Sequence, residues 1–232
     1  MALWSAAALA SFRATAPARD ITARIIADER FRPGALADMQ TKMSATSTLL
    51  IIQPEFALAR ALVAVSLAEQ TALRMTSGEA DREIGIAEAA VKSSLSLNPT
   101  DSFLWLMLYS LKTTRSGFGP DNVKYLDQSY LAAPLDGWIV LRRSRLALAI
   151  FPLLSAVVQS EVVSEFAALV DSGFFDEAAF ILTNVGWNQR EILLQSLQPL
   201  DPLPREAFAK RLEQNGAKVR VPGVVNPERP WR

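Results

Sequence analysis

Apolar residues recur at intervals of three and four along most of the chain, the spacing that is typical of amphipathic helices. The clearest case is the segment 55–75, which is rich in Ala and Leu and contains neither Gly nor Pro. Half of all residues are apolar, and Gly and Pro stand at breaks in the pattern rather than in repeats. The sequence therefore predicts an all-α protein.

Capping and helix-breaking residues divide this pattern into separate helices. Short leading helices are expected over 17–30 and after Pro33, before the long helix at 55–75. The sequence from Thr76 to Glu79 has the capping-box form, and Asp101 is a candidate N-cap for a helix that breaks in the loop 116–119. The complete set of later helices expected is 76–97, 101–115, 120–133, 136–151, 155–171, 176–185, 189–197 and 205–214.

Two stretches end in similar phrases, VKSSLSLNP and LDQSYLAAP, and their prolines are 35 residues apart. This period is close to the roughly 34 residues of a tetratricopeptide repeat. In that family, small and large residues alternate at fixed spacing before a Pro that closes the second helix. The matching positions are Ala87, Val91, Ser94 and Pro99, then Leu126, Ser129 and Pro134, with Trp105 at the expected place of a following Trp and Trp138 two residues early.

The chain therefore resembles a degenerate tetratricopeptide-repeat protein. The resemblance implies a short α-solenoid of antiparallel helical hairpins with extra terminal helices and an extended C-terminal tail. It is clearest over 55–150, and it departs from the family where Tyr109 replaces a Gly, Lys112 replaces a Tyr and Pro152 interrupts the third unit. The alternative is an irregular helical bundle in which the 35-residue echo arises by chance.

The domain organisation expected is an apolar N-terminal segment at 1–16, a helical-repeat domain at 17–215 and a Pro-rich extended or disordered tail at 216–232. The run ALWSAAALASF is too short to span a bilayer and has no basic residue before it. It is either a first packing helix or the remnant of a signal or anchor. The sequence leaves the location open between the cytoplasm and, if the segment is such a remnant, a membrane-associated or periplasmic site.

Charge and composition narrow the chemistry. The 24 basic and 24 acidic side chains balance, so no overall field favours nucleic acid. The chain has no Cys and no His, and it lacks the glycine-rich phosphate loops and the G-x-S-x-G elbow. We predict no catalytic, cofactor-binding or metal-binding residues, and a protein that is not an enzyme.

The densest charge feature is the arginine cluster Arg142, Arg143 and Arg145. In the family, the first helix of each hairpin lines a concave groove, and this implies a partner-binding groove in the present chain. Its predicted residues are Phe103, Leu106, Ser110, Trp138, Leu141, Arg142 and Arg145. Arginine forks suit carboxylates, so the expected partner is an acidic or C-terminal segment of another protein. Alternatively, these arginines pair with internal acids such as Asp127 or Asp136.

Other conspicuous side chains have simpler expected roles. Trp105, Trp138 and Trp187 are expected to fill gaps between hairpins, and Trp231 is a candidate docking residue in a tail that is otherwise a disordered end. The scattered acids Asp81, Glu83, Glu88 and Glu177 are expected on solvated helix faces.

Two functions follow from this sequence. The leading one is a non-enzymatic protein-interaction scaffold or adaptor that binds one partner segment in its groove. The alternative is an envelope-associated accessory protein of a membrane pathway, such as polysaccharide synthesis or export, tethered by residues 1–16.

Overall fold

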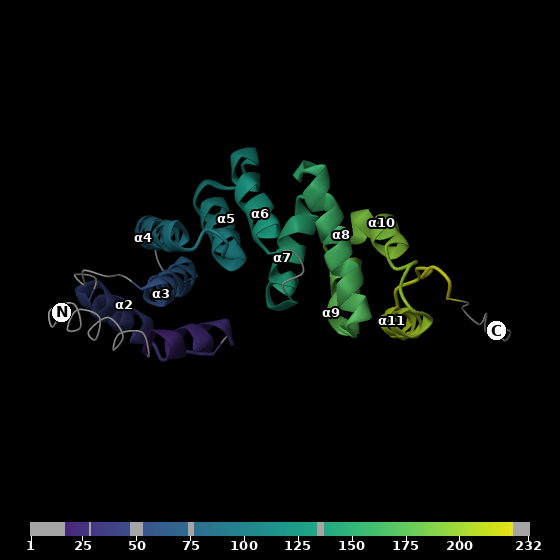
Figure 1. The fold of residues 1–232 in the computed structure, drawn as a ribbon, viewed down its shortest axis with the longest axis horizontal. Helices are drawn as coiled ribbons and strands as arrows, with labels where there is room; N and C mark the ends of the chain where they lie inside the picture. Colours follow the sequence, from purple (N-terminus) through teal and green to yellow (C-terminus); the bar gives the residue numbers. More distant parts are fainter. Residues whose placement is uncertain (1–16, 28, 47–52, 74–76, 134–136, 225–232) are drawn as a thin grey trace, which may run out of the picture. The chain divides into compact units, whose positions relative to one another are not determined.

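Every regular element that the structure describes is helical. The structure is a computed structural model that describes residues 17–27, 29–46, 53–73, 77–133 and 137–224. No strand occurs within those ranges, and helices account for most of them (Figure 1). The prediction of an all-α protein is confirmed.

The chain divides into two compact units, one running to Tyr125 and the other starting at Leu126. The division falls within helix α6 (Pro120–Ala132). The sequence predicts one helical-repeat domain over residues 17–215, whereas the helices of the folded chain form two groups, each with most of its contacts inside the group. Each unit is described below by itself.

The first unit is built from helices that pack on their neighbours in sequence. Residues 17–26 are helical, and they are followed by α2 (Ala35–Thr46), α3 (Pro54–Ala72), α4 (Ser77–Leu97) and α5 (Ser102–Ser116). Helix α3 packs against both α2 and α4, and α4 packs against α5. The side chains that α3 buries are Phe56, Ala57, Ala59, Ala61, Leu62, Val63, Ala64, Val65 and Ala68. This nearly all-round burial explains why α3 carries so few polar residues.

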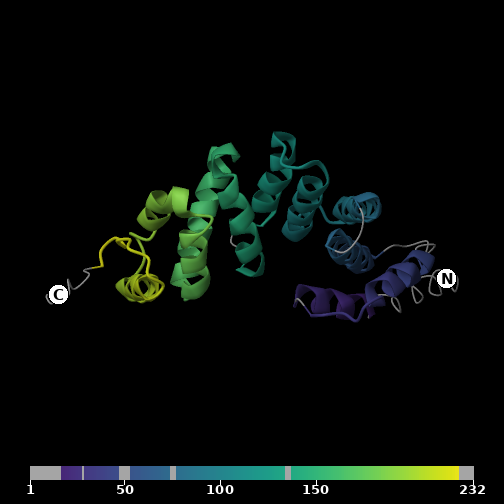
Figure 2. The same cartoon turned by 180° about the vertical axis from the view of Figure 1, so that it is seen from behind.

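The second unit centres on helix α8 (Ala156–Asp171), which contacts α7 (Gly137–Ala149), α9 (Phe175–Thr183), α10 (Arg190–Gln195) and α11 (Pro202–Gln214). Helix α9 also contacts α7 and α11 (Figure 2). The rings of Phe166 and Phe208 meet edge to face, with centroids 5.9 Å apart. Both side chains are buried, so this aromatic contact joins α8 to α11 in the core of the unit.

Local sequence chemistry accounts for several helix ends. Asp101 accepts a hydrogen bond from the Leu104 amide at 3.0 Å, and Ser155 accepts one from the Val158 amide at 3.3 Å. Gly173 ends α8 with φ +83° and Gly216 follows α11 with φ +75°, a region that other residues rarely adopt. Pro120 begins α6 as expected. The cap that the sequence predicts at Asp101 is therefore confirmed, and the structure adds a second cap at Ser155, where a helix was expected to begin.

The expected break at Pro152 takes the form of a short 3₁₀ helix, Phe151–Leu153, between α7 and α8. The apolar run around it is thus divided between three elements. Among the helices that the structure describes, none combines the length and the apolar character needed to cross a membrane.

The first part of the predicted tail packs on the second unit. Val221 is buried, and Arg205 of α11 donates a hydrogen bond to the Pro222 carbonyl at 2.9 Å. Residues 217–224 have no helix, as expected, but they are held against α11. The N-terminal segment 1–16 and the candidate docking residue Trp231 lie outside the described residues.

Mutation of Asp101 tests whether its side chain stabilises the N-terminus of α5. Asp101→Ala should lower the free energy of unfolding by about 1 kcal/mol, because the Leu104 amide loses its acceptor. Asp201→Ala is the matched control, since Asp201 stands at the N-cap of α11 without accepting such a bond. Urea unfolding followed by circular dichroism measures both. Equal losses in the two variants would contradict the assigned cap.

Candidate functional site

The predicted groove residues occupy two different helices, one in each unit. Phe103, Leu106 and Ser110 lie on α5 in the first unit. Phe103 and Leu106 are buried, with 5% and 0% of their surfaces exposed, so their side chains belong to the core of that unit. Ser110 is half-buried.

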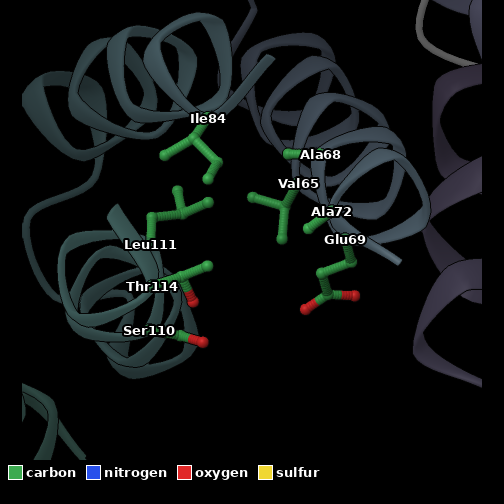
Figure 3. A pocket seen from close by; sticks show the side chains of 8 residues that line it. All are labelled: Val65, Ala68, Glu69, Ala72, Ile84, Ser110, Leu111 and Thr114. Atoms are coloured by element: carbon green, nitrogen blue, oxygen red, sulfur yellow. The ribbon is translucent and has the colours of Figure 1, made fainter. Parts of the chain in front are cut away.

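Ser110 lines a small cavity between α3, α4 and α5 (Figure 3). Val65, Ile84 and Leu111 point into this space from the three helices. Its volume of about 20 Å³ is enough for a single water molecule, far below the several hundred Å³ of a ligand pocket. Ser110 therefore lines a packing gap that is too small to hold a small-molecule ligand.

The α7 residues of the predicted groove reach the surface of the second unit. Arg142 and Arg145 are exposed, and Leu141 is half-buried. The guanidinium of Arg145 lies 5.3 Å from the ring centroid of Phe180 on α9, and that ring is itself 49% exposed. The side chain of Trp138 lies outside the described residues. The structure thus brings Leu141, Arg142 and Arg145 together on one helix, next to an exposed aromatic ring.

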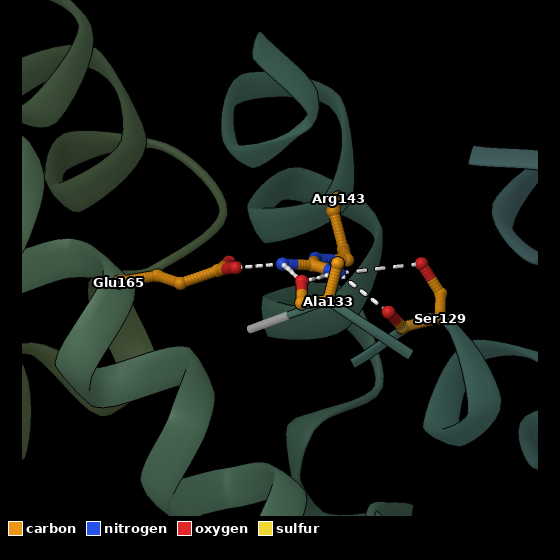
Figure 4. A network of polar contacts seen from close by, with 4 residues as sticks. All are labelled: Ser129, Ala133, Arg143 and Glu165. Carbon is orange, nitrogen blue, oxygen red and sulfur yellow. Dashed lines mark hydrogen bonds and ion pairs between the residues drawn. The ribbon is translucent and has the colours of Figure 1, made fainter. Parts of the chain in front are cut away.

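Arg143, the middle arginine of the cluster, is fully buried (Figure 4). Its Nη2 atom forms an ion pair with Glu165 of α8. Its Nη1 atom donates to the Ser129 carbonyl at 2.7 Å and to the Ala133 carbonyl at 3.1 Å. The guanidinium also lies 4.1 Å from the ring centroid of Tyr130. One side chain therefore ties together α6, α7 and α8.

The expected internal partners of the arginines were Asp127 and Asp136. Arg143 pairs instead with Glu165, while Asp127 accepts a hydrogen bond from the Ser155 amide and burial raises the pKa of its carboxyl group. Asp136 lies outside the described residues. The missed partner has a signal in the sequence, because Glu165 falls on the apolar face that Val158, Val162 and Leu169 define. An acid at such a position requires an internal cation.

The buried pair also shifts the chemistry of Tyr130. Burial raises the pKa of its hydroxyl well above the ordinary value, the Glu165 carboxylate raises it further, and Arg143 opposes both effects. Tyr130 therefore remains a neutral phenol against the ion pair, which suits a structural role.

Glu88 corrects the expectation of a solvated acid. Only 8% of the surface of Glu88 is exposed, because the residue lies between α4 and α5. Its Oε1 atom accepts from Lys92 Nζ at 2.5 Å and lies 2.7 Å from Lys112 Nζ, and its Oε2 atom lies 3.7 Å from Arg115 Nη1. Burial by itself would raise the pKa of Glu88, but the hydrogen bonds from Lys112 and Lys92 outweigh burial and hold it below its usual value. Lys112, a departure from the repeat pattern, thus joins the two helices.

The tryptophans divide between packing and exposure. Trp105 is half-buried, donates from Nε1 to the Pro99 carbonyl at 2.8 Å and stacks on Tyr125 at a centroid distance of 6.3 Å. Trp187, expected in the core, is instead 41% exposed beside a shallow hollow formed with residues 215–218. Arg190 lies over its ring, 5.0 Å from the centroid. The prediction of a gap-filling Trp187 is wrong because the chain turns at the end of α9 and leaves the ring at the surface.

Comparisons of this chain with protein-family models, with curated proteins and with solved structures gave no match. Within the described part of the chain, no group of three or more Asp, Glu, His or Cys residues could hold a metal ion. The resemblance to tetratricopeptide repeats thus stays a prediction from the residues themselves. The candidate site with the best geometric support is the α7 surface of Arg142 and Arg145 beside Phe180.

The buried ion pair predicts a large and specific loss of stability. Glu165→Gln should lower the free energy of unfolding by about 3–5 kcal/mol, because it leaves Arg143 charged and buried without its counter-ion. The double variant Arg143→Met with Glu165→Leu should lose less than Glu165→Gln alone. Chemical denaturation measures both. Glu191→Gln, at a 93% exposed position, is the control and should change stability by less than about 0.5 kcal/mol.

The depressed pKa of Glu88 predicts a sign for the pH dependence. A carboxyl whose pKa is lower in the folded state adds stability above its unfolded pKa and loses it as pH falls through the folded pKa. The difference in unfolding free energy between the native chain and Glu88→Gln should therefore be largest near neutral pH and shrink below about pH 4. Urea titrations between pH 3 and pH 7 test this. A difference that grows on acidification would show that the lysines do not hold the carboxylate.

Proposed function

We propose that this chain is a non-enzymatic scaffold, a short tetratricopeptide-like solenoid that binds an acidic segment of another protein. The α7 surface, defined as Leu141, Arg142 and Arg145 with Phe180 beside them, is the binding surface. The proposal rests on how the second unit presents that surface and on the helix contacts within each unit.

Contacts within the first unit support the hairpin arrangement. Lys112, late in α5, pairs with Glu88 in the middle of α4, while Trp105, early in α5, bonds to Pro99 just after α4. Contacts in this reversed order are those of antiparallel neighbours. In the second unit, α9 contacts both α7 and α11, and α8 contacts all three. In stacked hairpins, alternate helices such as α7, α9 and α11 lie side by side in one layer, and the helix between them in sequence, here α8, packs against that layer.

The single observation that carries the binding role is the difference in solvent exposure between neighbouring arginines on α7. Arg143 is buried in its pair with Glu165 and fixes the helix, whereas Arg142 and Arg145 on either side of it are exposed. The Arg145 guanidinium also lies 5.3 Å from the centroid of the Phe180 ring, and this contact restricts it before any partner arrives. An ordered arginine fork beside an exposed aromatic ring favours a partner with a carboxylate next to an apolar side chain.

The two acids of α9 that precede Phe180 are either paired or partly covered. Asp176 on α9 pairs with Arg211 at 3.0 Å, and Glu177, one turn before Phe180, is half-buried. An acidic segment therefore complements the α7 surface better than a basic one.

Replacement of the exposed arginines tests the proposal. Arg142→Ala with Arg145→Ala should weaken binding of the partner at least about tenfold, since charge-assisted hydrogen bonds are lost. Affinity capture by the full chain identifies candidate partners, and titration calorimetry with the purified partner measures the effect. Lys210→Ala with Arg220→Ala removes the same charge from exposed positions of the same unit and should leave binding unchanged. Equal binding by both variants, or catalytic turnover by the purified chain, would refute the proposed function.

A further inference from the structure

Three cations gather around one carboxylate on the first unit. Lys92, Lys112 and Arg115 all lie within ion-pair distance of Glu88, and no other ion pair involves any of the three among the residues that the structure describes. One negative charge thus faces three positive ones, and this leaves a surplus of two positive charges in a small volume. Arg115 stands in the last turn of α5, where the helix dipole reduces the surplus by at most about half a unit charge.

The buried carboxylate orders this cationic cluster, which consists of Lys92, Lys112 and Arg115. The ammonium groups of Lys92 and Lys112 lie 2.5 Å and 2.7 Å from the same Glu88 oxygen, so the two ammonium groups are held close to each other. The carboxylate lies inside, with its side chain 10% exposed, while the side chains of Lys92 and Arg115 are 52% and 48% exposed. Long basic side chains usually lose conformational entropy when they bind a ligand. Here the ion pairs with Glu88 already restrict the three basic side chains, so less conformational entropy remains to be lost on binding.

We propose that the cationic cluster is a binding site for a phosphate group. A phosphate monoester carries about −1.5 to −2 charges near neutral pH, close to the local surplus. Its three terminal oxygens provide an acceptor for each of the three cations, whereas a carboxylate provides one charge and two oxygens. The guanidinium of Arg115 contributes a fork that matches phosphate geometry, and the lysines act as point charges.

The acids nearest in sequence do not neutralise the cluster. Asp81 and Glu83 precede Glu88 on α4, and neither forms an ion pair with the three cations. Helix α5 contributes no acid of its own between residues 102 and 116. The site lies in the first unit and its residues are not those of the α7 surface, so it stands or fails independently of the proposed scaffold function.

Phosphate binding is measurable on the full chain by amide chemical shifts. The probes are inorganic phosphate, the peptide Gly-Gly-phosphoserine-Gly-Gly and its unphosphorylated form, titrated at constant ionic strength. Saturable shifts are expected at residues 88–92 and 112–116. Binding should tighten from pH 5.5 to pH 7.5 as the phosphate takes its second charge. Tighter binding of the phosphopeptide would identify a phosphorylated side chain as the source, and equal binding would identify free phosphate.

A charge-matched pair of variants separates a built site from general attraction. Lys112→Gln with Arg115→Gln should weaken phosphate binding about tenfold or more. Arg82→Gln with Lys124→Gln removes two positive charges from exposed positions of the same unit and should leave the affinity within about twofold. Circular dichroism confirms that both variants fold. Equal weakening in the two variants, shifts spread over all basic residues, or no saturable shift would overturn the proposal and indicate an adventitious ion only.

Discussion

The helices of this protein depend on one another for their stability. Apart from α3 and α4, the helices that the structure describes have 16 or fewer residues, and α9 and α10 have nine and six. Isolated helices of such lengths are marginal in water, because a few hydrogen bonds barely offset the cost of ordering the chain. Each helix therefore persists by burying an apolar face against neighbours, as α8 does against four others. Any polar group on such a face must find its partner inside the protein.

Glu165 and Glu88 show two outcomes of that constraint. Both acids lie where helices pack, and both meet cations from a neighbouring helix. Glu165 and Arg143 are fully enclosed, and carbonyl groups satisfy further donors of the guanidinium, so the pair is a structural link. Glu88 lies at the edge of its interface and collects three cations whose outer sides reach solvent. The same need for a counter-ion thus gives a buried ion pair in the second unit and a partly exposed cationic cluster in the first.

Overall neutrality conceals this arrangement. The 24 basic and 24 acidic residues give no net charge, and the sequence accordingly predicts local recognition without a global field. Folding then sorts the arginines of α7, because one is buried and its neighbours are exposed. The α7 surface was predicted in part, through Arg142 and Arg145, since exposed arginines are visible in a charge pattern. Phe103 and Leu106 were placed in the same groove by repeat analogy, but their large apolar side chains are buried in the first unit.

The amino-acid pattern is sufficient to predict an all-α protein and to place most helix ends within a few residues. Asp101, Ser155, Pro120 and Gly173 act on backbone groups a few residues away, so their effects need no knowledge of the rest of the chain. The pairing of charges, by contrast, depends on the tertiary fold. Arg143 and Glu165 are 22 positions apart, and Glu88 and Lys112 lie on successive helices. A short pattern can show that Glu165 falls on an apolar face and needs a cation, but the identity of the cation depends on the rotation and packing of whole helices, which arise from many weak apolar contacts.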